Sequence, residues 1–356
     1  MGSLREPSTQ AVENARPRPD TGSVHGPRAI RHILVCLDGS SLSELCLPDA
    51  IQLARTFGSA ITLLRVLPPV LDAGAQPCVD ALDSEIAKLE AEAYLHRVEQ
   101  EITSASDLRV DTRVEQGHAA ERIVALSHEL GADLTALGSH GESGLTQWAL
   151  GGTVRQVLAE LRGSVLVGRS TPRPQAPPGA RARILVPLDG TPRSESVLPT
   201  IASIARAGGA EVVLAHIAQE PAETVMLSSE EDLALSRELA ARLEAGASRY
   251  LERLRSQLAR EGTPARALVL RRADVLGSLL DVVQREGVDL VVLSAHGATC
   301  NPAHPFGSVS AHLLAHSTVP VLVLQDLTKS ELDRSDSSRQ PHSAPPLRAT
   351  FAPGND

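Results

Sequence analysis

Residues 31–54 read RHILVCLDGSSLSELCLPDAIQLA, and residues 182–205 read ARILVPLDGTPRSESVLPTIASIA. Each stretch starts with an apolar run that ends in Leu-Asp-Gly and continues with apolar residues at helical spacing, a pattern typical of a strand followed by a helix. The two aspartates, Asp38 and Asp189, lie 151 residues apart. Solenoid repeats are much shorter, about 20–50 residues. The sequence therefore predicts a duplicated domain.

The similarity continues outward from these openings. SAITLLRVL (59–67) corresponds to GAEVVLAHI (209–217), and the last apolar run SVLVG (164–168) corresponds to VPVLVLQ (319–325). In the first copy, short β-branched runs alternate with helical patterns over 31–37, 43–57, 60–66, 81–105, 108–115, 119–130, 133–138, 152–162 and 164–168. This alternation is typical of a parallel sheet covered on both faces. We expect an α/β fold of two tandem, doubly wound, Rossmann-like domains with five strands each.

Three stretches lack this periodicity. Residues 1–28 and 327–356 are rich in Pro, Arg, Ser and Gly, and residues 170–181 form a Pro-rich linker between the copies. Such segments cannot bury enough apolar surface to offset the entropy of ordering, so we predict disordered tails and an extended linker. The two folded domains are then unit one, residues 29–169, and unit two, residues 182–326.

Composition excludes several classes of function. The net charge is −9 and only six residues are aromatic, so neither a basic surface nor a stacking platform for nucleic acid is expected. Neither Lys88 nor Lys329 follows a Gly-rich loop, which excludes a P-loop of the Walker type. No apolar run approaches the roughly 18 residues that cross a membrane. With no secretory pattern and no paired cysteine spacing, we expect a reduced, cytoplasmic chain.

The candidate site of unit one follows its fourth strand. Gly138-Ser-His-Gly141 is followed after nine residues by Gly151-Gly152-Thr153 and a helix. Ligands of open α/β sheets bind at the carboxyl ends of the strands, where Asp38 ends strand one. Glycines let backbone N–H groups approach an anion, and a helix N-terminus adds its positive dipole end. The run therefore predicts a phosphate site, to which the Thr153 hydroxyl adds a donor.

With these residues the chain resembles the universal stress proteins in their tandem-domain form. The family pattern is Gly, two residues, Gly, nine residues, Gly and then Ser or Thr; here Gly152 occupies the hydroxyl position and Thr153 follows. The resemblance implies binding of an adenine nucleotide, ATP with or without Mg²⁺. It also implies that Asp38 holds the ribose and Val66 contacts the adenine. The cofactor-binding residues expected in unit one are Asp38, Val66, Gly138, Ser139, His140, Gly141, Gly151, Gly152 and Thr153.

Unit two departs further from the pattern. Its matching residues are Asp189, Ile217, Gly297, Gly307 and Ser308. Ser294 replaces the first glycine, and its Cβ is expected to crowd the backbone approach to an anion. Pro302 and Pro305 remove two N–H donors from the loop. We therefore expect nucleotide to bind more strongly in unit one.

The resemblance implies an ATP-binding regulatory module of the stress response that acts through a protein partner the sequence does not identify. The alternatives are a slow ATPase or phosphotransferase and a scaffold that no longer binds nucleotide. No Lys or Arg lies between Gly138 and Thr153 to neutralise a γ-phosphate, so we assign no catalytic residue. The apolar last strands are expected to pair, giving an intramolecular pseudo-dimer. A further homodimer of whole chains is compatible with this arrangement and has no support of its own in the sequence.

Other candidates are weaker. His312 and His316 lie at i, i+4, the spacing of two metal ligands on a helix, with His296, Cys300 and His304 nearby in sequence. Solvated or capping histidines are the preferred interpretation, and we assign no metal. Ser139 and His140 have no acid placed beside them, which argues against a hydrolase. Cys78 is expected to be the most exposed thiol.

Overall fold

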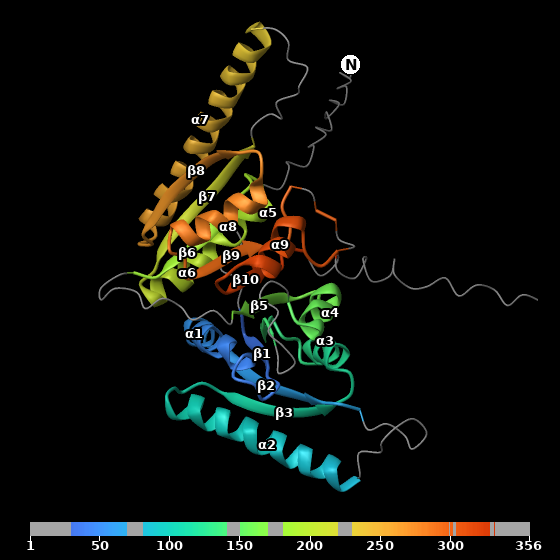
Figure 1. The fold of residues 1–356 in the computed structure, drawn as a ribbon. Helices are drawn as coiled ribbons and strands as arrows, with labels where there is room; N and C mark the ends of the chain where they lie inside the picture. The colour runs from blue at the N-terminus through green and yellow to red at the C-terminus, as the bar shows by residue number, and fades with distance from the viewer. Residues whose placement is uncertain are drawn as a thin grey trace, which may run out of the picture.

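The structure is a computed structural model that describes residues 30–69, 81–140, 150–169, 181–219, 230–298, 300–301, 304–327 and 331. Its elements follow in two series of the same kind (Figure 1). Unit one contains β1 (His32–Cys36), η1 (Ser43–Cys46), α1 (Leu47–Phe57), β2 (Ala60–Leu67), α2 (Ala81–Ser104), β3 (Val110–Gln116), α3 (Ala119–Glu129), β4 (Leu134–Gly138), α4 (Gly152–Glu160) and β5 (Ser164–Gly168). Unit two contains β6 (Arg183–Pro187), α5 (Pro192–Glu195), α6 (Leu198–Gly208), β7 (Glu211–Gln219), α7 (Glu230–Arg260), β8 (Ala265–Arg272), α8 (Val275–Arg285), β9 (Leu290–Ser294), α9 (Ser308–His316) and β10 (Val321–Leu324).

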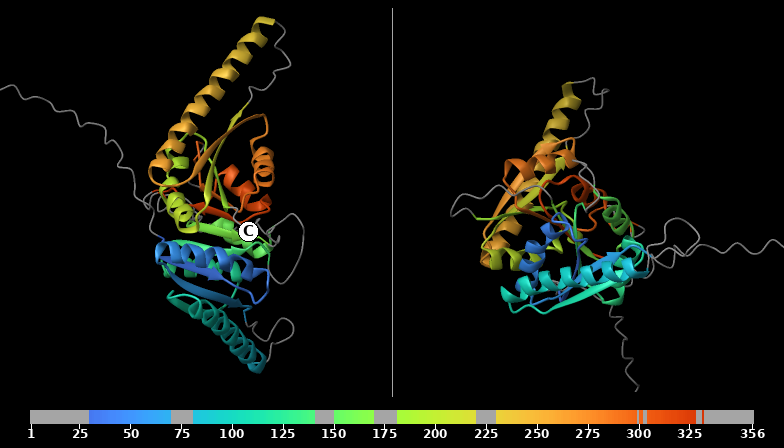
Figure 2. Two further views of the ribbon diagram at one scale, coloured as in Figure 1. Left: turned by 90° about the vertical axis from the view of Figure 1, so that its left-hand side faces the viewer. Right: turned by 60° about the horizontal axis from the view of Figure 1, so that its bottom comes forward.

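The strands form one sheet in the order β3-β2-β1-β4-β5-β10-β9-β6-β7-β8. Within each unit all neighbouring strands are parallel, which confirms the predicted doubly wound α/β fold. The units join through β5 and β10, which pair antiparallel with Leu322 opposite Leu166. The expected pairing of the last strands is thereby confirmed. Figure 2 shows the units on either side of this pair, with α2 and α7 furthest from it.

Each face of the sheet is covered by helices from both units. Successive strand residues point to opposite faces, so Ile33 of β1 lies in one core and Leu34 in the other. The first core is covered by α1, α2, α6 and α7, and the second by α3, α4, α8 and α9. Both cores therefore run through the boundary between the units.

The first helix of each unit is divided where the sequence suggested one helix. Pro48 and Pro199 stand in the first turn of α1 and α6. Proline has no N–H to donate and is tolerated in a first turn, so a new helix starts there. The preceding residues form the separate short turns η1 and α5.

The predicted C-terminal tail starts later than residue 327. Leu327 is buried, and its N–H donates to Oε1 of Gln325 at 3.1 Å. Glu331 accepts a hydrogen bond from Arg193 at 2.8 Å. The chain is therefore still attached to unit two at these positions. The predicted tail 1–28 and the stretch 170–180 lie outside the described residues, as does Cys78.

Candidate functional site

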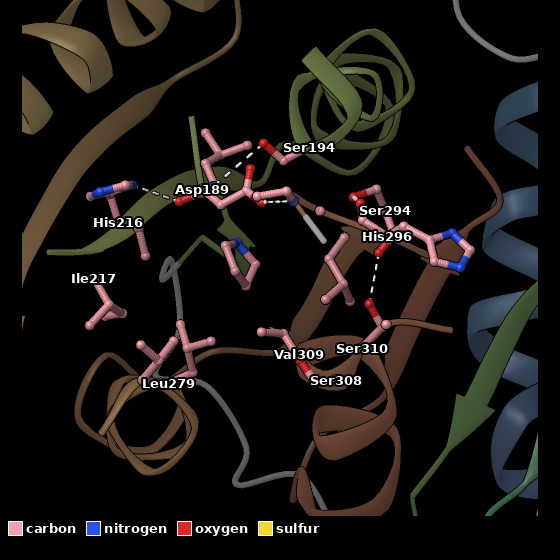
Figure 3. A pocket seen from close by; sticks show the side chains of 18 residues that line it. Asp189, Ser194, His216, Ile217, Leu279, Ser294, His296, Ser308, Val309 and Ser310 are labelled. Atoms are coloured by element: carbon pink, nitrogen blue, oxygen red, sulfur yellow. Dashed lines mark hydrogen bonds between the residues drawn. The ribbon is translucent and has the colours of Figure 1, made fainter. Parts of the chain in front are cut away.

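A pocket of about 510 Å³ lies at the carboxyl ends of β6, β7 and β9 in unit two (Figure 3). Asp189 follows β6, Ile217 is on β7, and Gly297 follows β9. The first turn of α9 closes the opposite side. All five residues that the sequence assigned to unit two line this pocket: Asp189, Ile217, Gly297, Gly307 and Ser308. The topology thus brings together groups from four separate segments.

Asp189 is a charged acceptor at the edge of this pocket. Its Oδ1 accepts hydrogen bonds from the N–H and hydroxyl of Thr191, at 3.0 and 2.6 Å, and its Oδ2 accepts the N–H of Ala298 at 2.7 Å. Burial alone would raise the pKa of Asp189, but these hydrogen bonds outweigh it and lower the pKa. The carboxylate is therefore ionised at neutral pH, in the form that accepts hydrogen bonds from hydroxyl groups.

Asp189 also explains the glycine at position 297. A Cβ on Gly297 would lie 2.2 Å from Oδ2 of Asp189, so any other residue must displace the carboxylate or the loop. The hydrogen bond from the N–H of Ala298 to Asp189 was not predicted from the sequence, because every residue except proline has a backbone N–H.

The N-terminus of α9 is held against the end of β9. The N–H of Gly307 donates to the carbonyl of Ala295 at 2.7 Å, and the Ser310 hydroxyl donates to the carbonyl of Ser294 at 2.8 Å. Gly307 is therefore occupied in closing the loop. The first N–H groups of a helix have no intrahelical partner, so those of Ser308 and Val309, with the Ser308 hydroxyl, are the groups suited to an anion.

The remaining wall of the pocket is apolar. Ile217, Leu279 and Val309 contribute aliphatic side chains (Figure 3). His216 is held by a hydrogen bond between its Nδ1 and the carbonyl of Leu188, at 2.8 Å. No Lys or Arg is among the described residues that line the pocket. The arrangement suits a ligand with three parts. The apolar wall can pack against a flat apolar group, the carboxylate can accept hydrogen bonds from hydroxyl groups, and the helix N-terminus can bind an anion.

Unit one repeats part of this geometry. Asp38 Oδ1 accepts the N–H and hydroxyl of Ser40, at 2.9 and 2.6 Å, and the N–H of Gly151 donates to the carbonyl of Ser139 at 3.0 Å. Val66 is half-buried on β2, and Gly152 and Thr153 are exposed in the first turn of α4. Gly141 and the loop to residue 149 lie outside the described residues, so the preference for unit one stays a prediction.

The glycine at the end of β4 has a packing explanation. A Cβ on Gly138 would lie 2.8 Å from both the carbonyl oxygen of Leu42 and the Cα of Ser43. In unit two the corresponding Ser294 is buried and donates its hydroxyl to the carbonyl of His296 at 2.6 Å. The close contact that requires glycine at position 138 is therefore with the chain at η1.

His140 lies beside Ser139, with Nδ1 3.2 Å from Oγ. A hydrolytic triad also needs a group that orients the imidazole. The other ring nitrogen, Nε2, is buried and has no hydrogen-bond partner in the part of the chain that the structure describes. The pair therefore lacks the third member of such a site there.

The histidines considered as metal ligands separate into two places. Side chains of His296, Cys300 and Asp326 come together at the ends of β9 and β10, with one ligand atom of each within 4.8 Å of the others. Both ring nitrogens of His296 are already hydrogen-bonded, and the guanidinium of Arg193 lies 2.8 Å from Asp326. A cation beside this carboxylate disfavours a metal ion. His312 and His316 lie on α9, away from this cluster and facing α8.

The fold and the site define a duplicated, doubly wound α/β protein with a pocket at the switch point of its second half. The sequence model of the universal stress protein family matches residues 29–169 and 181–325, and the chain belongs to that family in its tandem form. A universal stress protein of Mycolicibacterium smegmatis is 25% identical over 304 residues, covering 82% of this chain and 96% of the relative.

A solved structure that covers both units agrees on the fold. The crystal structure of a universal stress protein from Archaeoglobus fulgidus has a TM-score of 0.57 at 17% identity, covering 83% of this chain and 98% of its own. A universal stress protein solved in complex with cAMP matches 40% of this chain and 100% of its own, at 20% identity and a TM-score of 0.31. Among the described residues, no helix is long and apolar enough to cross a membrane.

Proposed function

We propose that this protein is an adenine-nucleotide-binding regulatory module of the stress response, with ATP as its ligand. Binding in unit one stays the prediction from the sequence, and the unit-two pocket is the second site, for which the structure describes the lining. The observation that carries the proposal is the convergence of three complementary groups on one cavity of about 510 Å³. Asp189 would accept hydrogen bonds from the ribose hydroxyls, and Ile217 would contact the adenine. The phosphates would lie against Ser308 and the N-terminus of α9.

The charge of the pocket favours binding over turnover. Phosphoryl transfer needs a positioned nucleophile and neutralisation of the γ-phosphate, usually by Mg²⁺ with Lys or Arg. The described lining offers a carboxylate, hydroxyls and N–H groups, but no Lys or Arg. With Asp189 on the ribose, the Ser308 hydroxyl would be the group of this pocket available to a Mg²⁺ ion bound with the nucleotide. Hydrolysis, if present, is expected to be slow.

The cysteines bear on the cellular location of the protein. Cys36, Cys46 and Cys300 are free thiols, which agrees with a reducing cytoplasmic location. Burial raises the pKa of Cys46 to about 12, so that thiol is inert. We further propose that nucleotide occupancy alters binding to a protein partner, and that the pseudo-dimer within the chain is its basic assembly.

Titration calorimetry of the full chain with ATP, ADP, AMP and cAMP tests the nucleotide proposal, after native mass spectrometry for co-purified ligand. Asp189→Ala should weaken ATP binding tenfold to a hundredfold, since hydrogen bonds to a charged group contribute about 1.5–3 kcal/mol. Asp107→Ala, an exposed aspartate of unit one, is the control. A loss confined to Asp38→Ala would assign binding to unit one. No nucleotide bound by the wild type would favour the scaffold alternative.

A further inference from the structure

Two backbone N–H groups beside the unit-two pocket are already used within the protein. The N–H of Ala298 donates to Oδ2 of Asp189 at 2.7 Å, and the N–H of Gly307 donates to the carbonyl of Ala295 at 2.7 Å. An N–H group that has a partner can bind a phosphate oxygen only by giving that partner up, and the abandoned acceptor would then be unpaired. These two groups are therefore not available to a phosphate.

The loop between Ala298 and Gly307 adds few donors. Pro302 and Pro305 have no N–H, and the N–H of His304 donates to the carbonyl of Asn301 at 3.0 Å. Loops that bind several phosphates do so with a series of backbone N–H groups that converge on the anion. The described part of this loop does not provide such a series.

The donors that remain belong to the first turn of α9. They are the N–H groups of Ser308 and Val309, which have no intrahelical partner, and the Ser308 hydroxyl. The Ser310 hydroxyl is not among them, because it donates to the carbonyl of Ser294 at 2.8 Å. Figure 3 shows Ser308 and Val309 together at one end of the pocket. This set matches the terminal oxygens of a single phosphate group.

The charges around the pocket oppose a ligand with several phosphates. Asp189 is ionised, and no Lys or Arg is among the lining residues that the structure describes. His296 also lines the pocket, but its ring nitrogens are occupied by Asp326 and by the carbonyl of His304. Each phosphate beyond the first adds about one negative charge to the nucleotide. Its repulsion by the carboxylate is therefore not offset by a cation of the described lining.

Unit one has a cation where α9 has none. Gly151 and Gly307 are the N-cap residues of α4 and α9. The N–H of Arg155 donates to the carbonyl of Gly151 at 3.0 Å, and the N–H of Ala311 donates to that of Gly307 at 2.9 Å, so Arg155 and Ala311 are equivalent. Both are exposed. Helix side chains are tilted toward the N-terminus, so the arginine extends toward the first turn of α4.

We infer that the unit-two pocket binds adenosine with a single phosphate, AMP, in preference to ATP. The inference rests on the proposed nucleotide function of this pocket and narrows its ligand class. One phosphate would accept the hydrogen bonds of Ser308 and Val309, whereas further phosphates would add repulsion from Asp189 without a matching cation. With ATP expected in unit one, the two halves of the chain would respond to different adenine nucleotides.

The test is calorimetric titration of the full chain carrying Asp38→Ala, which weakens binding in unit one, with adenosine, AMP and ATP in the absence of Mg²⁺. We expect AMP to bind most tightly and ATP at least tenfold more weakly, a difference of about 1.4 kcal/mol. Adenosine should also bind more weakly than AMP, because it has no phosphate for α9. The double variant Asp38→Ala/Asp189→Ala is the blank and should lose most of the AMP binding.

Unit one provides the matched variant. Ala311→Arg, made in the Asp38→Ala chain, gives α9 the arginine that α4 has and should raise the affinity for ATP more than that for AMP. Ala311→Gln, which adds a long side chain without charge, is the control and should leave the difference between the two nucleotides unchanged. If both variants narrowed the difference equally, charge would not set the preference and the inference would be wrong.

Three further results would overturn the inference. The first is ATP that binds the Asp38→Ala chain as tightly as AMP does, which would leave the proposed nucleotide function in place. The second is AMP binding that is unchanged in the double variant, which would place AMP outside the unit-two pocket. The third is an Asp38→Ala chain that binds no nucleotide although the wild type does. A wild type that binds none of these nucleotides would instead refute the proposed function itself, and the inference with it.

Discussion

Asp326 accepts two hydrogen bonds from His296, one from its backbone N–H at 2.8 Å and one from its ring Nδ1 at 3.0 Å. The Nε2 of the same ring lies 2.9 Å from the carbonyl oxygen of His304. Neither a carboxylate nor a carbonyl can donate, so these contacts favour the imidazolium form of the ring, in which both nitrogens carry protons. Each side chain of the pair is 1% exposed, and Arg193 binds the second oxygen of Asp326. This charge network connects the loop after β9 with the chain after β10.

The network predicts a stability that depends on pH. Burial opposes the charged ring, but the hydrogen bonds with Asp326 and His304 outweigh it and raise the pKa of His296. A group whose pKa is raised on folding stabilises the protein fully below its unfolded pKa, about 6.5, and loses this contribution as the pH rises through the folded pKa. We expect the free energy of unfolding of the wild type to fall over that range relative to His296→Gln.

Urea unfolding of both proteins from about pH 6 to about pH 9 measures this difference. The other charged and titratable groups near the ring, which include Arg193, Cys300 and Glu331, are present in both proteins. Their contributions therefore largely cancel in the difference between the wild type and the variant. Asp326 has a lowered pKa, so its own contribution is lost only as the pH falls through the acid range. Superimposable pH profiles would show that the ring is not charged in the folded protein.

The surroundings of Gly138 and Gly152 predict that alanine at these two positions changes the free energy of unfolding by different amounts. Gly138→Ala should destabilise by about 1–3 kcal/mol, the usual cost of overpacking, because its Cβ would meet Leu42 and Ser43 at 2.8 Å. Gly152→Ala, in the first turn of α4 with nothing within 4 Å of the added Cβ, should be neutral or stabilising. Thermal and urea unfolding compare the two variants. Equal losses would mean that the contact at η1 relaxes without cost.

The loop glycines predict a difference in nucleotide binding. Gly297→Val should displace Asp189, whose Oδ2 would lie 2.2 Å from the added Cβ, and so reduce binding in unit two. Gly141→Val is predicted from the sequence to abolish binding in unit one and to leave the fold largely intact. Stoichiometry measured by calorimetry separates these effects. If both variants bound nucleotide like the wild type, neither loop would be part of a nucleotide site.

The side chain of Gln325 links the two units by a hydrogen bond, which we expect to stabilise the protein. Its Nε2 donates to the carbonyl of Arg162 at 3.1 Å, and its Oε1 accepts the N–H groups of Asp326 and Leu327. The side chain is 2% exposed, so Gln325→Leu leaves buried groups unpaired and should cost about 1–3 kcal/mol. Gln100→Leu, on the exposed face of α2, is the control and should change stability little. A loss no greater than that of the control would show that water replaces these hydrogen bonds.

The sequence by itself determined the architecture of each unit. Apolar runs and helical spacing report locally which residues become buried, so ILVCLD and ILVPLD sufficed to predict two parallel α/β units. The apolar character of both last strands also predicted their pairing, since an exposed edge of that composition is an aggregation hazard. The correspondence of Asp189, Ile217 and Gly307 with a family pattern placed them in one site.

Only the tertiary structure decided which groups meet. The sequence shows that Gly138 is small, but the contact that requires it comes from Leu42 and Ser43, nearly a hundred residues earlier in the chain. The hydrogen bond from the N–H of Ala298 to Asp189 was likewise not predicted. Hydrophobic periodicity predicts that a position is buried but does not predict which element covers it. Backbone N–H and carbonyl groups are the same in nearly every residue, so residue type does not predict their partners. Those contacts are therefore fixed by the packing of elements that are distant along the chain.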